Sequence, residues 1–371
     1  MNSYLCDLIR ENPNTWETIC EEKNIRVKRD ATLPYVIFNY IINADFTDPV
    51  VKEARGIIID IEKLEVVCWP FNKFGNSHES YADTIDWRTA RVQEKIDGSI
   101  QKLWFSKRLG VWVWSTNSCI FATEAKAASG RTFQAIIEST PEYALLKEGL
   151  LNRLTKAYTY IFELVSPDNQ VVIRYPDARL WHIGTRNNTT GDEYDLFIDI
   201  QRPKEYPLHS LAACKKAAME LNKNDFPDAE GFVVVDKNWH RVKIKSPEYL
   251  LWHHAVSNDG FNKETAYDLF RSDDFSWDVF SSNVSEYVLK KAKFYSQAIV
   301  QALDAVEYVV DRTRALQSQG LSRKDIALQI KDLPGAAFGF KALSNDLDVN
   351  GLIELMGVNS FLKLVPEYVE D

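Results

Sequence analysis

The pattern of apolar residues changes once along the chain, near residue 255, and this change constrains the fold more than any other feature. Before it, segments that suit antiparallel strands follow one another with short turns, at 25–28, 35–40, 56–61 and 65–69. After it the strand signals stop, and apolar residues recur at helical spacing from Val288 to Val309. We therefore predict an α+β fold, with mixed, mainly antiparallel sheets over residues 1–254 and a small all-helical domain over 255–371.

Further local signals place elements inside both regions. Residues 3–11 and 208–221 predict helices, and 131–153 predict a helix interrupted at Pro141, which can begin a helix but not sit inside one. Strands are expected to start near 158, 171 and 179, and the apolar run 111–114 predicts a buried strand. In the C-terminal part, residues 283–286 resemble a capping box, and Ser322 is expected to begin another helix after Gly320.

Composition limits the cellular setting. A chain of 371 residues with 45% hydrophobic content can bury a large core in two domains, and its five cysteines lack the C-x-x-C spacing of a zinc site. No apolar run reaches membrane-spanning length, so we expect a soluble protein in the cytoplasm. We also expect a monomer. The net charge of −9 argues against a general nucleic-acid coat, so a nucleic-acid partner would require the cations to be gathered in a groove.

One short stretch, residues 94–100, suggests covalent chemistry. Lys95 precedes a turn formed by Asp97 and Gly98, and a strand is expected to follow. A lysine becomes a nucleophile only when burial or nearby cations lower its pKa from about 10.4. Alone, the K-x-D-G pattern fits a solvated lysine in a surface turn equally well.

Four other stretches follow in a fixed order around Lys95. They are Arg55-Gly56, Phe162-Glu163, Glu230-Gly231 and Lys243-Ile244-Lys245. This set resembles the covalent nucleotidyltransferase superfamily, which contains polynucleotide ligases and messenger RNA capping enzymes. Residues 53–57, 70–74, 162–169, 186–191 and 242–246 are most similar to the ATP-dependent RNA ligases of the phage RNA ligase 1 type. The resemblance is specific from about residue 35 to 255.

The resemblance implies a role for each motif residue. Lys95 would attack the α-phosphate of ATP and carry AMP, while Lys243 and Lys245 would lie against that phosphate, lower the pKa of Lys95 and stabilise charge. Glu230 would hold Mg²⁺ (or Mn²⁺) near the phosphates, and Glu163 would bind a ribose hydroxyl. The remaining cofactor-binding positions would be Glu94, Arg55, Gly56, Lys73, Asp97 and Gly98. Each has a plainer alternative: lysines on an exposed strand edge, carboxylates at strand ends, or a solvated loop lysine.

The last two motifs also permit a geometric prediction. If residues 237–240 form the loop of a hairpin, Val234 faces Lys243 and Phe232 faces Lys245. Alternation would then place Glu230, Lys243 and Lys245 on one side. A loop one residue longer or shorter would separate them.

Two positions leave questions open. The family usually has a basic residue where this chain has Thr116. Either another cation, such as Lys102 or Lys126, supplies that contact, or the enzyme handles a later step differently. Trp181 and His182 lie in an expected strand and are candidates to stack on adenine, although both could belong to the core.

The resemblance implies an ATP-dependent RNA ligase that joins a 5′-phosphate to a 3′-hydroxyl through lysyl-AMP and an RNA-adenylate, with transfer RNA repair as the family's usual task. The helical domain is expected to select the RNA. A capping guanylyltransferase or a DNA ligase is the alternative enzyme, but those usually carry a β-rich OB domain where this chain turns helical. A catalytically silent sensor of RNA ends is the remaining alternative.

Overall fold

The computed structural model describes residues 3–41, 43–221, 227–256, 261–271, 277–281, 284 and 286–369, without the side chains of 254–256, 278 and 279. The chain divides into two compact units, Met1–Lys223 with Pro227–Tyr249, and Asn224–Phe226 with Leu250–Asp371. The sequence analysis expects this division after residue 254. Within the described residues, no helix is long and apolar enough to cross a membrane.

The first unit begins with a four-stranded antiparallel sheet in the order β1-β2-β3-β4. Its strands are β1 (Ile25–Arg29), β2 (Tyr35–Tyr40), β3 (Arg55–Asp60) and β4 (Glu65–Cys68). Helices α1 (Tyr4–Glu11) and α2 (Trp16–Glu22) pack on one face, and the short α3 (Pro49–Glu53) leads into β3. The buried carboxylate of Glu53 accepts hydrogen bonds from Ser3 Oγ and Leu5 N, which fixes the start of the chain against β3.

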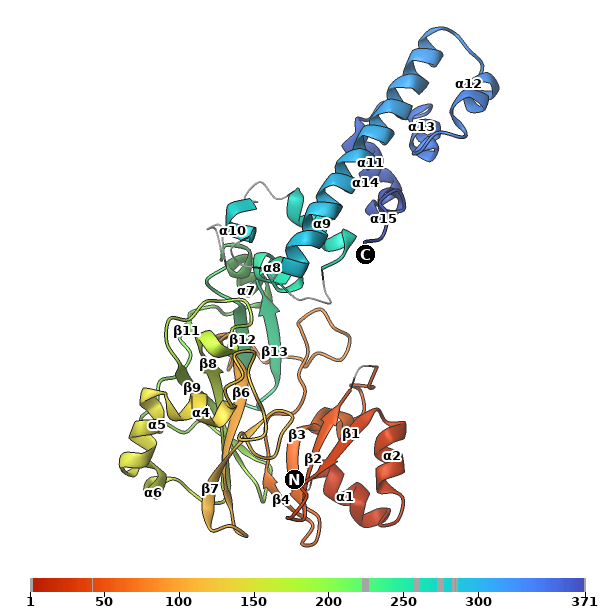
Figure 1. Cartoon of the computed structure of the whole chain (residues 1–371). Helices are drawn as coiled ribbons and strands as arrows, with labels where there is room; N and C mark the ends of the chain where they lie inside the picture. Colours follow the sequence, from red (N-terminus) through yellow and green to blue (C-terminus); the bar gives the residue numbers. More distant parts are fainter. Residues whose placement is uncertain are drawn as a thin grey trace. The chain divides into compact units, whose positions relative to one another are not determined.

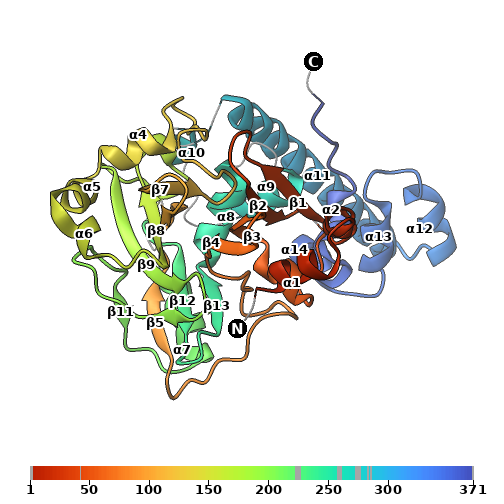
Figure 2. The ribbon, with the colours of Figure 1, turned by 90° about the horizontal axis from the view of Figure 1, so that it is seen from below.

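A five-stranded antiparallel sheet, in the order β10-β9-β8-β6-β7, forms the centre of this unit. The strands are β6 (Ser99–Ser106), β7 (Val111–Thr116), β8 (Tyr158–Val165), β9 (Arg179–Asn187) and β10 (Glu193–Tyr194). Its two faces separate successive residues of β6: Trp104 packs toward the N-terminal sheet, whereas Leu103 packs toward the helices after β7. Those helical segments are α4 (Phe133–Glu138), α5 (Pro141–Leu145), η1 (Leu146–Leu150) and α6 (Leu151–Arg153). Figure 2 shows these layers from one end.

A third sheet, in the order β11-β5-β12-β13, carries the motif residues Glu94, Lys243 and Lys245. Its strands are β5 (Arg91–Glu94), β11 (Glu205–Tyr206), β12 (Gly231–Val235) and β13 (Arg241–Lys245). Helix α7 (Leu211–Met219) contributes Cys214 and Ala218 to the cluster of apolar side chains from β5, β12 and β13. All paired strands of the three sheets are antiparallel.

The second unit is helical wherever the structure describes regular elements (Figure 1). Its longest helix, α11 (Glu286–Ser318), buries the predicted stripe from Val288 to Val309. The Ser322 hydroxyl accepts a hydrogen bond from Asp325 N and caps α12, as predicted. The other elements are α8 (Pro247–Val256, spanning the boundary), α9 (Lys263–Phe270), α10 (Trp277–Ser281), α12 (Arg323–Ile330), α13 (Ala336–Ala342), α14 (Val349–Met356) and α15 (Val358–Leu362). Residues 282, 283 and 285, which include two of the four positions of the suggested capping box, lie outside the described residues.

The predicted fold class is confirmed, and two local predictions are wrong. No strand begins near residue 171, because the N–H groups of Val172 and Ile173 donate to the carboxylate of Asp97 instead of to a neighbouring strand. The run 111–114 is buried only in part: Val111 is 52% exposed at the start of β7, which is an edge strand.

Candidate active site

A cavity of about 690 Å³ in the first unit brings most of the motif residues together. Its wall includes the motif residues Arg55, Glu94, Lys95, Gly98, Glu163, Lys243 and Lys245. These residues come from all three sheets and from the segment between β5 and β6. The cavity therefore exists only when the three sheets are assembled.

Lys95 follows the end of β5, where its backbone N–H donates to Gly231 O at 2.9 Å. Its side chain is 20% exposed, and Nζ lies 2.6 Å from Glu230 Oε2. The other oxygen of Glu230 lies 2.8 Å from Lys245 Nζ. One buried carboxylate thus joins the candidate nucleophile to a second lysine, and its single negative charge is shared between two ammonium groups.

The β12–β13 hairpin holds Lys243 and Lys245, and its register differs from the prediction by one residue. Val233 pairs with Lys243, and Gly231 pairs with Lys245. The loop has three residues rather than four, because Trp239 adopts a positive φ of 67° and Asp236 N donates to His240 O. The predicted pairings of Val234 with Lys243 and of Phe232 with Lys245 are therefore wrong.

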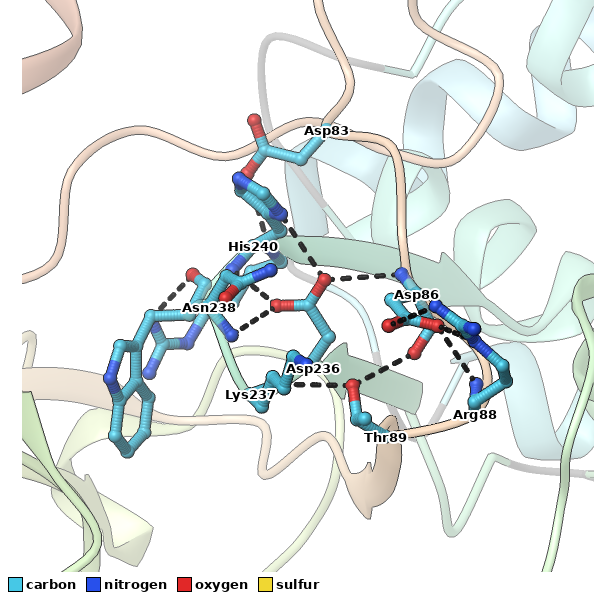
Figure 3. Close-up of polar contacts among 10 residues, drawn as sticks. Asp83, Asp86, Arg88, Thr89, Asp236, Lys237, Asn238 and His240 are labelled. Carbon is cyan, nitrogen blue, oxygen red and sulfur yellow. Dashed lines mark hydrogen bonds and ion pairs between the residues drawn. The ribbon is translucent and has the colours of Figure 1, made fainter.

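The carboxylate of Asp236 explains why the loop is short (Figure 3). Its Oδ1 accepts from the backbone N–H groups of Asn238 and His240, and its Oδ2 accepts from Asp86 N and contacts His240 Nδ1 at 3.1 Å. The side chain of Asp236 is fully buried, and these hydrogen bonds outweigh burial and hold its pKa below the ordinary value. The turn is thus closed and tied to the segment before β5.

Despite the shifted register, Glu230 reaches Lys245 because Gly231 interrupts the regular alternation of the strand. Regular alternation would place Glu230 on the face of Phe232 and Val234, which packs with α7. Gly231 instead has φ +138°, and a Cβ there would lie 2.2 Å from Ile244 O. A side chain at this position is excluded, so the glycine of the motif directs the carboxylate to the lysines.

Two further cations, Lys243 and Arg55, line the cavity. The ammonium of Lys243 and the guanidinium of Arg55 lie 5.6 and 5.1 Å from the centre of the Phe74 ring. Burial, together with the neighbouring cations Lys73, Arg55, Lys95 and Lys245, lowers the pKa of Lys243 to about 7. Burial also lowers the pKa of Arg55, whose guanidinium remains charged. The structure therefore places uncompensated positive potential at one side of the cavity.

Glu163, at the cavity side of β8, has the opposite shift. Burial raises the pKa of Glu163 to about 8, with Glu230 contributing in the same direction and Lys95 opposing it. At neutral pH its carboxyl group is mostly protonated, so it can donate as well as accept a hydrogen bond. Such a group suits a ribose hydroxyl better than a metal ion.

The remaining predicted positions lie around the cavity rather than in it. Asp97 is buried and accepts hydrogen bonds from Val172 N, Ile173 N and Tyr249 Oη, so its carboxylate anchors the backbone beside Lys95. Lys73 lines a neighbouring cavity of about 360 Å³, and its ammonium lies 4.8 to 5.9 Å from the ring centres of Phe46, Tyr40 and Tyr81. That second cavity shares Phe74 with the first.

Gly56 and Lys102 do not line the cavity, but each is next in sequence to a residue that does. Lys102 has no exposed surface and donates to Gly56 O, and burial lowers its pKa to about 8. A Cβ at Gly56, where φ is +82°, would lie 2.5 Å from Asn117 O, so the residue must be glycine for β3 to approach this loop. Lys102 therefore cannot take the place of a cation at Thr116, whereas Lys126 lines the cavity.

The two aromatic candidates on β9 do not line the cavity. His182 is buried, contacts Thr185 Oγ1 through Nε2 at 2.9 Å, and has its pKa lowered to about 4 by burial. Ile183, which follows His182 on β9, has no paired residue on β8 and forms a β-bulge. Ile183 lines the cavity instead of Trp181 and His182. The sequence gives no sign of this bulge.

Arg241 is a further residue of the site that was not predicted from the sequence. Arg241 lines both cavities, lies 4.1 Å from the ring centre of Phe71 and pairs with Glu193 at 2.7 Å. The alternation of Arg241, Lys243 and Lys245 along one strand is a signal that could have identified it.

This combination of an antiparallel α+β domain, a lysine paired with a carboxylate and a cation-rich cavity is that of a nucleotidyltransferase domain. The chain belongs to the RNA ligase family, whose family model, described as RNA ligase, matches residues 53–249. The match covers both walls of the cavity.

Individual relatives agree with the family. A protein of Autographa californica nuclear polyhedrosis virus, named "Putative bifunctional polynucleotide kinase/RNA ligase", is 32% identical over 257 residues, which cover 64% of this chain and 36% of that protein. The RNA ligase of Rhodothermus phage RM378 is 23% identical over 84% of this chain and 85% of its own length. Among solved structures, an archaeal ATP-dependent RNA ligase has a TM-score of 0.47 at 15% identity, covering 80% of this chain and 82% of its own.

Proposed function

We propose that this protein is an ATP-dependent RNA ligase that joins a 5′-phosphate to a 3′-hydroxyl in three phosphoryl transfers. In the first, neutral Lys95 Nζ attacks the α-phosphate of ATP, a P–N bond forms, and the bond to pyrophosphate breaks. In the second, an oxygen of the RNA 5′-phosphate takes AMP from Lys95. In the third, the 3′-hydroxyl attacks the RNA phosphorus and AMP leaves.

One observation carries the proposal: in a member of the RNA ligase family, Lys95, Glu230 and Lys245 form one ion-pair chain at a cavity that also contains Arg55 and Lys243. A nucleophilic lysine needs a polyphosphate bound beside it, and Arg55 and Lys243 at the same cavity would bind one. Lys95 must leave Glu230 and lose its proton before it can attack, so the ion pair represents the resting state.

The other side chains have roles that follow from their surroundings. Lys243 and Arg55 would stabilise the charge that develops on the transferred phosphate and on pyrophosphate. Glu163, neutral at pH 7, would bind a ribose hydroxyl of ATP, and Glu94 at the end of β5 would lie near the base. Lys73 would need to leave its three aromatic rings to reach the triphosphate.

Glu230 would hold magnesium or manganese. Within the described residues, no group of three or more acidic, histidine or cysteine side chains could bind a metal by itself. Magnesium is usually bound by one or two carboxylates together with phosphate oxygens, and the single buried Glu230 fits that donor set. When bound, the metal would supply electrostatic stabilisation of the phosphates.

The substrate beyond ATP is an RNA with 5′-phosphate and 3′-hydroxyl ends, and we propose a broken transfer RNA as the repaired molecule. Support for an RNA substrate comes from the family and from relatives in a virus and a phage. The protein would act as a monomer in the cytoplasm, that of the host cell if the gene is phage-encoded. The helical second unit would select the RNA, since a strand-rich OB domain is absent from its described residues.

The test is labelling with ATP radioactive at the α-phosphate. We expect a labelled protein whose label is removed by mild acid but not by alkali, as a P–N bond requires, and which passes its AMP to 5′-phosphorylated RNA. Labelling by GTP instead would indicate a capping enzyme, and transfer to nicked DNA alone would indicate a DNA ligase. Absence of label with an intact fold would indicate a silent sensor.

A further inference from the structure

Gln101 on β6 has a buried acceptor that lacks a partner. Its side chain is fully buried, it lines the active-site cavity, and its Oε1 has no hydrogen-bond partner within the described part of the chain. Its Nε2 contacts Ser99 O at 3.4 Å. A buried acceptor without a partner destabilises the fold, so a ligand that donates to this oxygen would recover that free energy.

Strand register places Gln101 on a different side of the sheet from the proposed ATP site. Ile100 pairs with Glu163, whereas Gln101 pairs with Phe162 on β8 and with Thr116 on β7. Paired residues share a face, and successive residues of a strand lie on opposite faces. The cavity therefore extends around the beginning of β6 and has a second side, away from Glu163.

The side chains around Gln101 could receive the parts of a nucleotide. We call the side lined by Gln101, Thr116, Lys126 and Phe133 the Gln101 lobe. Lys126 is exposed and forms no ion pair with the described residues, so it is free to contact a phosphate. Phe133, at the start of α4, packs against the apolar cluster on this face and still lines the cavity, which leaves ring surface for a base.

We propose that the Gln101 lobe binds a terminal nucleotide of the RNA, with Gln101 Oε1 accepting a hydrogen bond from a ribose 2′-hydroxyl. This inference rests on the function proposed above. Phosphate oxygens cannot donate to Oε1 at neutral pH, and the exocyclic amines differ from base to base. The 2′-hydroxyl is a donor on every ribonucleotide and is absent from DNA, so Gln101 selects RNA irrespective of its sequence.

The experiment compares RNA oligonucleotides that carry a single 2′-deoxy substitution in the terminal nucleotide at the 5′-phosphate end or at the 3′-hydroxyl end. We expect the wild-type chain to seal the all-ribose RNA about tenfold faster than one of the two substituted RNAs. In Gln101→Leu this ratio should fall close to one. Gln101→Glu, which retains an acceptor, should preserve it, and Gln134→Leu on the outer surface of α4 should resemble the wild type.

Two further measurements separate this inference from its alternatives. Gln101→Leu should keep the wild-type preference for ATP over 2′-deoxy-ATP in the labelling reaction. If that variant instead loses discrimination between ATP and 2′-deoxy-ATP, Gln101 contacts the cofactor and the inference is wrong. It is also wrong if the ribose-to-deoxyribose ratio survives in Gln101→Leu, if neither substituted end is disfavoured by the wild type, or if the effect follows base identity.

Binding of the same oligonucleotides, followed by fluorescence anisotropy, provides a readout without turnover. Preference of the wild type for the ribose end, lost in Gln101→Leu, would support the lobe even if the chain failed to label with ATP. In that case the ligase activity would be the failed proposal. If Gln101→Leu does not fold, Gln101→Met and the wild-type response to the deoxy substitutions decide the question.

Discussion

Lys95 and Lys102 lie close together in the sequence, yet their surroundings differ in the feature that matters for catalysis. Lys95 borders a cavity and pairs with a carboxylate, so a polyphosphate can approach it. Lys102 is sealed between two sheets, and a backbone carbonyl is its hydrogen-bond acceptor. Lys95 is therefore a candidate nucleophile because a ligand can reach it and because it can leave its carboxylate partner. Lys102, which is buried without access to the cavity, has a structural role.

The comparison is tested most strongly by removing each amine. Lys95→Ala should reduce ATP labelling by more than about a thousandfold, because no other amine occupies its place, and should leave the melting temperature nearly unchanged. Lys102→Met should retain labelling within about tenfold, since an apolar side chain of similar length can fill the same space. Labelling by the folded Lys95→Ala variant, or its complete loss in a folded Lys102→Met variant, would reverse the assignment.

The next effect concerns the partner of the Lys95 ion pair. Lys245→Ala should reduce labelling about a hundredfold, because it removes a cation and leaves the Glu230 carboxylate with Lys95 alone. Lys237→Ala, in the loop of the same hairpin, is the matched control and should label like the wild type. Equal losses in the two variants would mean that the hairpin, rather than the ammonium group, is responsible.

Glu163 should show a smaller effect that depends on pH. Since its pKa is raised to about 8, the carboxyl group is neutral below that pH, and Glu163→Gln should label within about threefold of the wild type at pH 7. Above pH 8 the wild-type carboxyl ionises next to the phosphates, so the ratio of variant to wild-type rate should rise. A ratio independent of pH between 6.5 and 9 would contradict the proposed neutral form.

The last effect is on the free energy of unfolding rather than on labelling, and it concerns Lys102. Its folded-state pKa of about 8 is below the ordinary 10.5, so between these values the unfolded chain binds more protons and wild-type stability rises with pH. Lys102→Met lacks this rise. The free energy of unfolding of the variant minus that of the wild type should therefore fall by at most about 3 kcal/mol from pH 7 to pH 10. Urea unfolding at the two pH values measures it, and a constant difference would show that Lys102 keeps its proton.

Parts of the fold could be predicted because the signals are local. The strands β1 to β4 and the stripe of α11 follow from alternation and helical spacing, which need no distant partner. The hairpin register failed because Asp236 closes a three-residue loop with bonds that reach as far as Asp86. The expected strand near 171 failed for a similar reason, since Asp97 takes its backbone N–H groups.

The sequence by itself determined the residue types of the candidate site: a lysine before a turn, two carboxylates, paired lysines and the glycines between them, in an order specific enough to indicate the RNA ligase family. Only the tertiary structure decided which of these side chains meet. It turned Glu230 toward Lys95 and Lys245 and gave Lys102 a supporting position. It also left Gln101 Oε1 without a hydrogen-bond partner among the residues that the structure describes. The physical reason is that access and hydrogen-bond satisfaction depend on neighbours brought from other strands, which no local pattern specifies.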